Sequence, residues 1–90
     1  MNKQAHEVKL LVVDDEIEIV EELSDFLLDS GYACYTSQNA EQTLEQFASD
    51  PQIGIVLCDL HMPGVNGLQL IEQLERLAGR DRPFQAIIFT

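Results

Sequence analysis

The chain has 90 residues, enough for one domain, and 46% of them are apolar, which is too many for a disordered acidic tail. Sixteen acidic against five basic side chains give a formal net charge of −11. That charge argues against direct contact with nucleic acid or an anionic membrane surface, because phosphate would be repelled.

The chain begins with a strand pattern and a helix pattern. Val8–Val13 is almost wholly apolar, which is typical of a strand buried on both faces of a parallel sheet. Residues 16–30 show helical spacing, with acids crowding the first turns where the helix dipole favours negative charge. Gly31 is placed to end this helix in a left-handed conformation. The expected inward stripe consists of Val20, Leu23 and Leu27, widened by Ile19 and Phe26.

A second strand and helix follow. Tyr32–Thr36 is a short strand of aromatic and small residues, and Asn39 can cap a helix over Ala40–Ser49. The Asp50-Pro51 pair ends that helix, because the residue before proline disfavours helical geometry. The expected inward face consists of Leu44, Phe47 and Ala48.

The third unit is a strand, a loop and a helix. Ile53–Cys58 is apolar, and residues 60–66 contain Pro63 and Gly64, which is typical of a loop. We expect Met62 to be a packing residue and Gly67 to permit close approach where the helix over residues 67–78 begins. The expected inward residues of this helix are Leu68, Ile71, Leu74 and Ala78.

The last element is a fourth strand, Phe84–Phe89, after a turn over residues 79–83. Strands that alternate with helices of this length require right-handed crossovers and a parallel sheet with helices on both faces. The sequence therefore predicts an α/β, doubly wound parallel sheet with four strands and three helices.

Two cysteines, Cys34 and Cys58, are too few for a disulfide scaffold, and both lie in predicted strands, so we expect buried reduced thiols. No apolar run is long enough to span a bilayer, and the first ten residues lack the apolar core of a signal peptide. We therefore expect a cytoplasmic protein that does not enter a membrane.

Polar residues follow three of the predicted strands at the point where each strand ends. Asp14 and Asp15 come directly after the first strand, Asp59 after the third and Thr90 after the fourth. Ligands of open parallel sheets bind outside the carboxyl ends of the strands. If the first and third strands are neighbours, their ends lie about 5 Å apart, and the three carboxylates must share one small site.

These carboxylates could also be ordinary surface acids, since aspartate is common in loops as a helix cap. However, two carboxylates about 5 Å apart repel each other by roughly 3 kcal/mol at an effective dielectric constant near 20. Domain stabilities are only about 5–15 kcal/mol, so three such acids are costly. A hard divalent cation removes the repulsion, and a Mg²⁺ site is therefore the favoured interpretation.

Three segments together resemble a response-regulator receiver domain of the CheY-like kind. They are residues 11–16 (LVVDDE), 57–67 (LCDLHMPGVNG) and 87–90 (IIFT). The double acid, the Asp-x-x-Met-Pro-x-x-x-Gly pattern and the hydroxyl residue fall in the order of that family. The resemblance covers nearly the whole chain and implies a flavodoxin-like (βα)n receiver fold with strand order 2-1-3-4-5.

The resemblance implies a phosphoacceptor switch of a two-component signal transduction system. Asp59 matches the residue that takes a phosphoryl group from a sensor histidine kinase or phosphotransfer protein. Asp15 matches a direct Mg²⁺ ligand, with Asp14 acting directly or through water. Asp59 and the backbone carbonyl of His61 complete the metal site, and Thr90 hydrogen-bonds the phosphoryl oxygen. Such a domain catalyses only its own Mg²⁺-dependent phosphorylation and dephosphorylation, and it switches an output surface or an effector domain.

The resemblance also implies that residues 1–90 are an incomplete receiver domain. A whole receiver continues through another helix, a fifth strand and a last helix, which carry a lysine that pairs with the acceptor phosphate. The fourth strand, Phe84–Phe89, would then be an uncovered apolar edge. We expect either self-association across that edge or a longer protein of which this segment is a piece.

Other classes of function leave different marks in a sequence. A receiver-like interaction module that works without phosphorylation would be marked by loss of Asp15 or Asp59, and both are present. A phosphohydrolase of the haloacid dehalogenase type favours an Asp-x-Asp pair, and here His61 stands in place of the second acid. A dinucleotide-binding enzyme needs a Gly-x-Gly-x-x-Gly run after the first strand, which the chain does not have there. We expect a solvent-facing His61 imidazole, since zinc would need a partner His or Cys at useful spacing.

Overall fold

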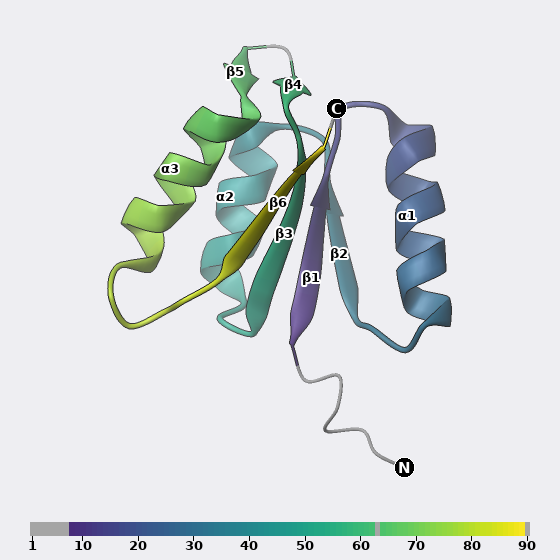
Figure 1. Cartoon of the computed structure of the whole chain (residues 1–90), viewed down its shortest axis with the longest axis horizontal. Helices are drawn as coiled ribbons and strands as arrows, with labels where there is room; N and C mark the ends of the chain where they lie inside the picture. Colours follow the sequence, from purple (N-terminus) through teal and green to yellow (C-terminus); the bar gives the residue numbers. More distant parts are fainter. Residues whose placement is uncertain (1–7, 63, 90) are drawn as a thin grey trace.

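A four-stranded parallel sheet runs through the molecule (Figure 1). In the computed structural model, the described residues are 8–62 and 64–89. The strands are β1 (Lys9–Val13), β2 (Cys34–Ser37), β3 (Ile53–Asp59) and β6 (Gln85–Phe89), arranged in the order β2-β1-β3-β6. All neighbouring pairs are parallel, so the four strands end at the same edge of the sheet. The predicted doubly wound fold is confirmed.

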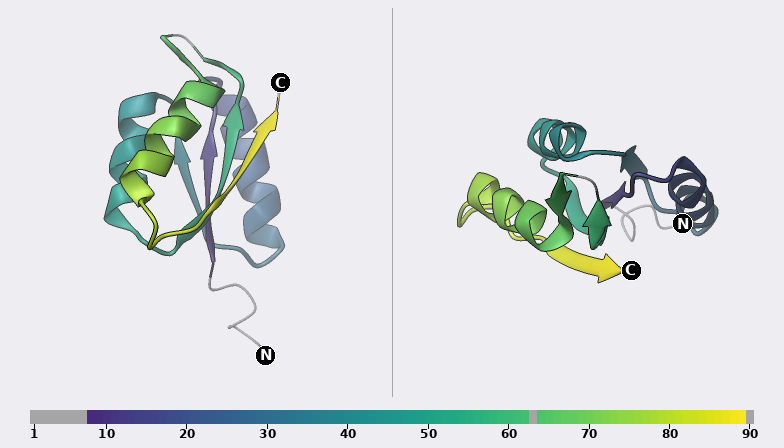
Figure 2. Two further views of the ribbon diagram at one scale, coloured as in Figure 1. Left: turned by 60° about the vertical axis from the view of Figure 1, so that its left-hand side comes forward. Right: turned by 90° about the horizontal axis from the view of Figure 1, so that it is seen from above.

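Three helices cover the two faces of the sheet (Figures 1 and 2). Helix α1 (Ile17–Asp29) lies on one face, and α2 (Ala40–Ser49) and α3 (Gly67–Ala78) lie on the other. The predicted bounds of α2 and α3 are confirmed to the residue, and those of α1 to within one residue at each end. Each helix carries the chain from one parallel strand to the next, as a doubly wound sheet requires.

The helix ends carry the capping chemistry that the sequence predicts. Gly31 follows α1 with φ +97°, and its N–H donates to the Leu28 carbonyl at 3.0 Å. The Tyr32 N–H donates to the Leu27 carbonyl at 3.0 Å, which completes a Schellman motif. At the start of α2, the Asn39 side chain accepts the N–H of residue 42 at 2.8 Å.

The main hydrophobic core lies between the sheet and helices α2 and α3. Its buried members are Leu11, Val13, Phe47, Ile53, Val56, Cys58, Met62, Leu70 and Leu74. The expected inward positions Phe26, Ala48 and Leu68 are wrong, because all three side chains are exposed. Helix α1 packs against β1 and β2. This contact surface is too narrow for an apolar stripe as wide as the expected one, and Phe26, which widens that stripe, stays exposed. Helix α2 buries Thr43 with Phe47, and α3 buries Leu70 with Leu74, in each case residues four apart on one helix face.

The segment expected to be a loop, residues 60–66, forms a small hairpin instead. β4 (His61–Met62) and β5 (Val65–Asn66) pair antiparallel, with Gly64 in the turn at φ +88°. Met62 is 8% exposed and joins the core, which confirms its packing role. The strong turn residues predict the reversal of the chain, but two paired residues on each side are too few to give a strand pattern.

The two cysteines differ in how deeply they are buried. Both thiols are free, Cys58 is buried and Cys34 is only partly buried, so the expected burial is confirmed in full for Cys58 alone.

Within residues 8–62 and 64–89, no helix combines the length and apolar character that crossing a bilayer requires.

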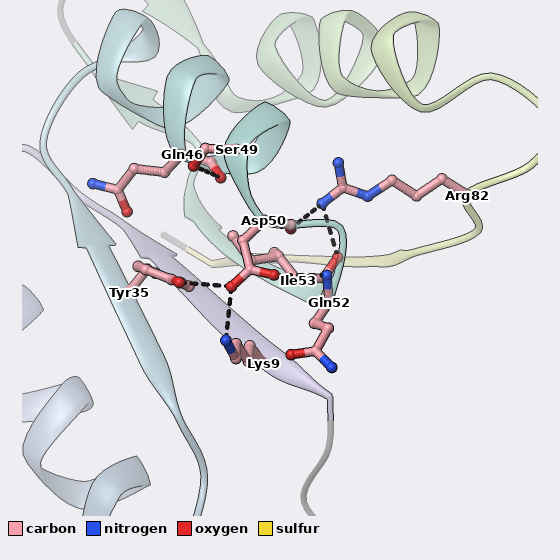
Figure 3. A network of polar contacts seen from close by, with 8 residues as sticks. All are labelled: Lys9, Tyr35, Gln46, Ser49, Asp50, Gln52, Ile53 and Arg82. Atoms are coloured by element: carbon pink, nitrogen blue, oxygen red, sulfur yellow. Dashed lines mark hydrogen bonds and ion pairs between the residues drawn. The ribbon is translucent and has the colours of Figure 1, made fainter.

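A polar cluster around Asp50 fixes the end of the sheet opposite to the carboxyl ends of the strands (Figure 3). Asp50 Oδ2 accepts hydrogen bonds from Lys9 Nζ at 2.8 Å and the Tyr35 hydroxyl at 2.6 Å, and Oδ1 accepts the Gln52 N–H at 2.9 Å. The hydrogen bond from Lys9, followed by those from Tyr35 and Gln52, lowers the pKa of Asp50 to about 2. The cluster therefore ties β1, β2 and the turn between α2 and β3 together.

Arg82 joins the segment before β6 to the same turn (Figure 3). Its Nη2 donates to the Asp50 carbonyl at 2.7 Å and to the Ile53 carbonyl at 3.3 Å. Its guanidinium lies 3.6 Å from the ring centroid of Phe47, which in turn meets Phe84 edge-on at 5.0 Å. One side chain thus anchors the start of β6 by hydrogen bonds and by stacking.

Candidate functional site

Three aspartates meet at the carboxyl edge of the sheet. Asp14 and Asp15 follow β1, and Asp59 ends the neighbouring strand β3. One carboxylate oxygen from each of the three residues lies within 4.8 Å of the other two. The structure therefore brings together the acids that the strand ends led us to expect in one site.

Asp14 is the most deeply placed of the three. It is 4% exposed, and its Oδ1 accepts the Glu16 N–H at 3.0 Å. Burial, the nearby charge of Asp59 and the neighbouring Asp15 together raise the pKa of Asp14 above its ordinary value, and burial is the largest cause. The folded chain thus pays an electrostatic penalty for keeping this carboxylate charged.

Asp59 is partly buried and is held in a similar way. Its Oδ1 accepts the His61 N–H at 3.2 Å, whereas Asp15 is exposed. In both Asp14 and Asp59 the carboxylate bonds the backbone two residues further on, which is the local turn that aspartate favours. These backbone donors fix the direction of the two carboxylates without adding a positive side chain.

Gly67, the first residue of α3, lies close to the backbone of Asp59 and Leu60. Its N–H donates to the Leu60 carbonyl at 2.9 Å. A Cβ atom at position 67 would lie only 2.8 Å from the Asp59 carbonyl oxygen and 3.2 Å from the Leu60 Cα. The expected close approach at the start of α3 is confirmed, and the backbone that Gly67 approaches is that of Asp59, one of the three clustered acids.

The acids open into a pocket of about 650 Å³. Its lining residues are Asp14, Asp15, Glu16, Ile19, Glu22, Leu23, Asp59, His61 and Phe89. Sequence reasoning missed the apolar wall of Ile19, Leu23 and Phe89, because these residues look like ordinary core positions of a helix and a strand. The site therefore combines carboxylates at its base with apolar side chains beside them.

Two further residues were predicted for the site, His61 and Thr90. His61 is exposed and lines the pocket, and it pairs with Asn66 in the β4–β5 hairpin. Its role as a backbone-carbonyl ligand stays a prediction. Thr90 lies outside the described residues. Its neighbour Phe89 is the register partner of Asp59, and the Phe89 carbonyl accepts the Leu60 N–H at 2.8 Å.

The donor set fits a magnesium ion. All three candidate ligands are carboxylate oxygens, the hard donors that Mg²⁺ prefers, and the pocket leaves room for the waters that Mg²⁺ keeps. Within the described part of the chain, neither histidine nor cysteine belongs to the cluster, so zinc is not favoured. A divalent cation would relieve the mutual repulsion of the three acids.

Comparison with known proteins decides the family. The family model of the response regulator receiver domain matches residues 10–90. This chain belongs to the response regulator receiver family. The two-component response regulator PprB of Pseudomonas aeruginosa is 44% identical over 81 residues, which cover 90% of this chain and 30% of that protein.

Two solved receiver structures show the same fold. The crystal structure of a response regulator receiver protein from Pseudomonas putida has a TM-score of 0.80 and 27% identity, covering 90% of this chain and 65% of that one. The crystal structure of the response regulator protein TrrA from Thermotoga maritima, in complex with Mg(2+)-BeF, has a TM-score of 0.73. It is 27% identical and covers 92% of this chain and 87% of that one.

Membership of the receiver family gives a coarse function. Receiver domains belong to two-component response regulators, are generally not classical enzymes and interact with histidine kinases or phosphotransfer proteins. This receiver chain spans about 30% of the length of PprB. That residues 1–90 form an incomplete receiver domain stays a prediction.

Proposed function

We propose that Asp59 accepts a phosphoryl group from a sensor histidine kinase or a phosphotransfer protein. The observation that carries this proposal is the meeting of Asp14, Asp15 and Asp59 within 4.8 Å at the carboxyl edge of a receiver-family sheet. The related TrrA structure, which holds Mg(2+)-BeF, supports the same use of the fold.

Phosphoryl transfer requires placement and charge neutralisation more than covalent assistance. The His61 N–H holds Asp59 Oδ1, and within the described chain Oδ2 has no hydrogen-bond donor and remains available as the nucleophile. An oxygen of Asp59 forms the new bond to phosphorus, the bond from phosphorus to the imidazole nitrogen of phosphohistidine breaks, and its electron pair leaves with the imidazole.

Asp14, Asp15 and Asp59 would hold Mg²⁺, with the His61 carbonyl as a further ligand. The ion would supply the positive charge that lets an anionic phosphate approach three carboxylates. Asp14 is oriented for this role by the Glu16 N–H. We assign Thr90 to the hydrogen bond with the phosphoryl oxygen, since it follows the register partner of Asp59.

The modified residue would act as a switch through local charge. Phosphorylation adds negative charge and acceptor oxygens at Asp59, next to the hairpin of β4 and β5 and the end of β6. Rearrangement of those segments would bias an output surface or an effector domain.

Incubation with acetyl phosphate and Mg²⁺, followed by intact-mass measurement, tests the proposal. We expect one phosphoryl adduct on the unmodified chain, no adduct when Mg²⁺ is chelated, and no adduct on Asp59→Asn. Asp29→Asn, at the exposed end of α1, is the matched control and should keep the adduct. An adduct that persists on Asp59→Asn, or none on the unmodified chain, would contradict the proposal.

A further inference from the structure

A second pocket lies between α1, β2 and α2, on the side of the sheet away from β6. Its volume is about 360 Å³, and its lining residues all lie between positions 17 and 46. They are Ile17, Val20, Thr36, Ser37, Gln38, Gln42, Glu45 and Gln46. The pocket shares none of these residues with the pocket of the three acids, so it is open to a separate role.

Gln46 places an unpaired acceptor at this pocket. Its side chain reaches from α2 towards β2, where Nε2 donates to the Thr36 carbonyl at 2.8 Å (Figure 3). Its Oε1 is buried and receives no hydrogen bond from the residues that the structure describes. Turning the amide over would bring Oε1 against the Thr36 carbonyl oxygen, so the hydrogen bond fixes this orientation. A buried acceptor without a donor is costly, and the site therefore favours a ligand that supplies an N–H group.

The Ser37 hydroxyl adds a second buried acceptor. Thr43 Oγ1 donates to the Asn39 carbonyl at 2.7 Å and lies 2.6 Å from Ser37 Oγ. Since a hydroxyl has one proton, Ser37 must donate to Thr43, and the Ser37 oxygen can only accept a hydrogen bond from a ligand. Ser37 is 2% exposed. The buried oxygens of Ser37 and Gln46 thus both call for a donor.

The other lining residues favour a cation on an apolar stem. Glu45 is exposed, and it is the one charged residue among the described residues that line the pocket. Ile17, which is 49% exposed, and Val20 supply apolar surface from α1. An anion would meet only acceptors and a negative charge in a chain of net charge −11. One carboxylate is too little to hold a magnesium or calcium ion.

We propose that this pocket binds a guanidinium group carried on an apolar stem. The planar fork of guanidinium N–H donors can serve Gln46 Oε1 and the Glu45 carboxylate together, and a guanidinium is more weakly hydrated than an ammonium group. The stem packs on Ile17 and Val20. An arginine side chain of another protein and a free guanidino compound share this chemistry.

NMR titration of the isotope-labelled chain with Nα-acetyl-arginine amide tests the proposal. We expect saturable shifts at the Gln46 side-chain amide and at the Gln38 N–H, which donates to Gln42 Oε1 in the pocket wall. In the matched probe, Nα-acetyl-citrulline amide, a neutral urea group replaces the guanidinium. We expect this probe to bind at least about tenfold more weakly. Equal binding of the two probes, or shifts confined to the residues around Asp15 and Asp59, would overturn the proposal.

Variants at the pocket locate the binding site. Glu45→Gln removes the charge with little change of shape and should weaken binding of the arginine probe about two- to fivefold. Glu72→Gln, at an exposed position of α3 outside the pocket, is the matched control and should leave the affinity unchanged. Unchanged affinity in Glu45→Gln, or an equal loss in Glu72→Gln, would refute the assignment.

Gln46→Met removes the buried acceptor and should weaken binding about tenfold or more. The same substitution removes the hydrogen bond to Thr36, so circular dichroism must show that the variant keeps its fold. If it does not, Glu45→Gln and the citrulline probe decide. A folded Gln46→Met protein with unchanged affinity would contradict the role of Oε1.

Two further measurements separate the sources of the ligand and the two sites. Free arginine that binds more tightly than the blocked probe identifies a small guanidino compound, and free arginine that binds equally or more weakly identifies an arginine within a protein. Asp59→Asn should bind the arginine probe as the unmodified chain does, because Asp59 does not line this pocket. Loss of binding in Asp59→Asn would place the probe at the three acids and overturn the proposal.

Discussion

Asp14 and Asp59 lie at the ends of neighbouring parallel strands and place carboxylate oxygens within 4.8 Å of each other. Each is held by a backbone N–H two residues further along the chain, at 3.0 Å from Glu16 and 3.2 Å from His61. These donors orient the carboxylates, but they leave the like charges side by side. The fold therefore keeps a repulsion in place that a bound cation would relieve.

The first prediction concerns the stability of the metal-free chain. Asp14→Asn removes one charge and keeps the Oδ1 acceptor for the Glu16 N–H. We expect the free energy of unfolding in chelator to rise by about 1 kcal/mol or more, since like charges about 5 Å apart repel by about 1 to 3 kcal/mol. Urea denaturation measures the change, with the exposed Asp29→Asn as control. A lower free energy of unfolding for Asp14→Asn would contradict the claim that repulsion between the three carboxylates destabilises the metal-free chain.

Gly67→Ala tests the support of Asp59 by α3. The added Cβ would meet the Asp59 carbonyl oxygen at 2.8 Å, so the backbone must shift. We expect a loss of about 1–3 kcal/mol of stability together with weaker Mg²⁺ binding. Gly54→Ala is the matched control, because its Cβ would meet the end of the Val8 side chain at 3.0 Å and lies away from the acids. Unchanged Mg²⁺ affinity in Gly67→Ala would show that the contact between Gly67 and the Asp59 backbone does not position Asp59 for metal binding.

The Asp50 cluster predicts a defined dependence of stability on pH. The pKa of Asp50 is lowered to about 2 in the folded chain, chiefly by the hydrogen bond from Lys9, against about 3.9 for an unperturbed aspartate. The native state therefore binds the proton less readily, and the stabilisation is complete above pH 4 and lost as the pH falls towards 2. We expect the stability difference between the unmodified chain and Asp50→Asn to shrink over that interval.

A series of urea denaturations between pH 2 and pH 7 measures this difference. The same comparison with Asp29→Asn controls for the general titration of surface acids. A difference between the unmodified chain and Asp50→Asn that stays constant down to pH 2 would show that Asp50 is not held in its charged form by Lys9 and Tyr35.

The contacts of Arg82 predict that stability depends on the planar shape of its guanidinium group, and not only on its positive charge. Its guanidinium bonds two carbonyls and stacks on Phe47 at 3.6 Å, which an ammonium group cannot reproduce. We expect Arg82→Lys to cost about 1–3 kcal/mol of unfolding free energy. Arg80→Lys, at an exposed position in the same segment, should change stability little in the same thermal or urea assay. Equal effects at the two positions would refute the anchoring role of Arg82.

The sequence predicts features that local chemistry decides. The caps at Gly31 and Asn39 follow from residue type, and Asp14 and Asp59 follow directly from where apolar strands end. The close approach at Gly67 was likewise predictable, because only a glycine leaves room for backbone there.

Features that depend on distant parts of the chain were not predictable in this way. Leu68 and Leu70 are equally apolar, and only the direction in which α3 meets the sheet decides that Leu70 is buried. Arg82 reaches the Asp50 carbonyl across 32 residues, and no local pattern marks that contact. Gln46 gives no apolar signal, although its side-chain amide donates a hydrogen bond to the Thr36 carbonyl of β2.

Calorimetric titration of Mg²⁺ tests most directly whether the three acids form a metal site. We expect saturable binding to one site in the unmodified chain and in Asp29→Asn, and loss or strong weakening of binding in Asp15→Asn and Asp59→Asn. Absence of saturable binding, or the same affinity in all four proteins, would show that Asp14, Asp15 and Asp59 do not form a magnesium site.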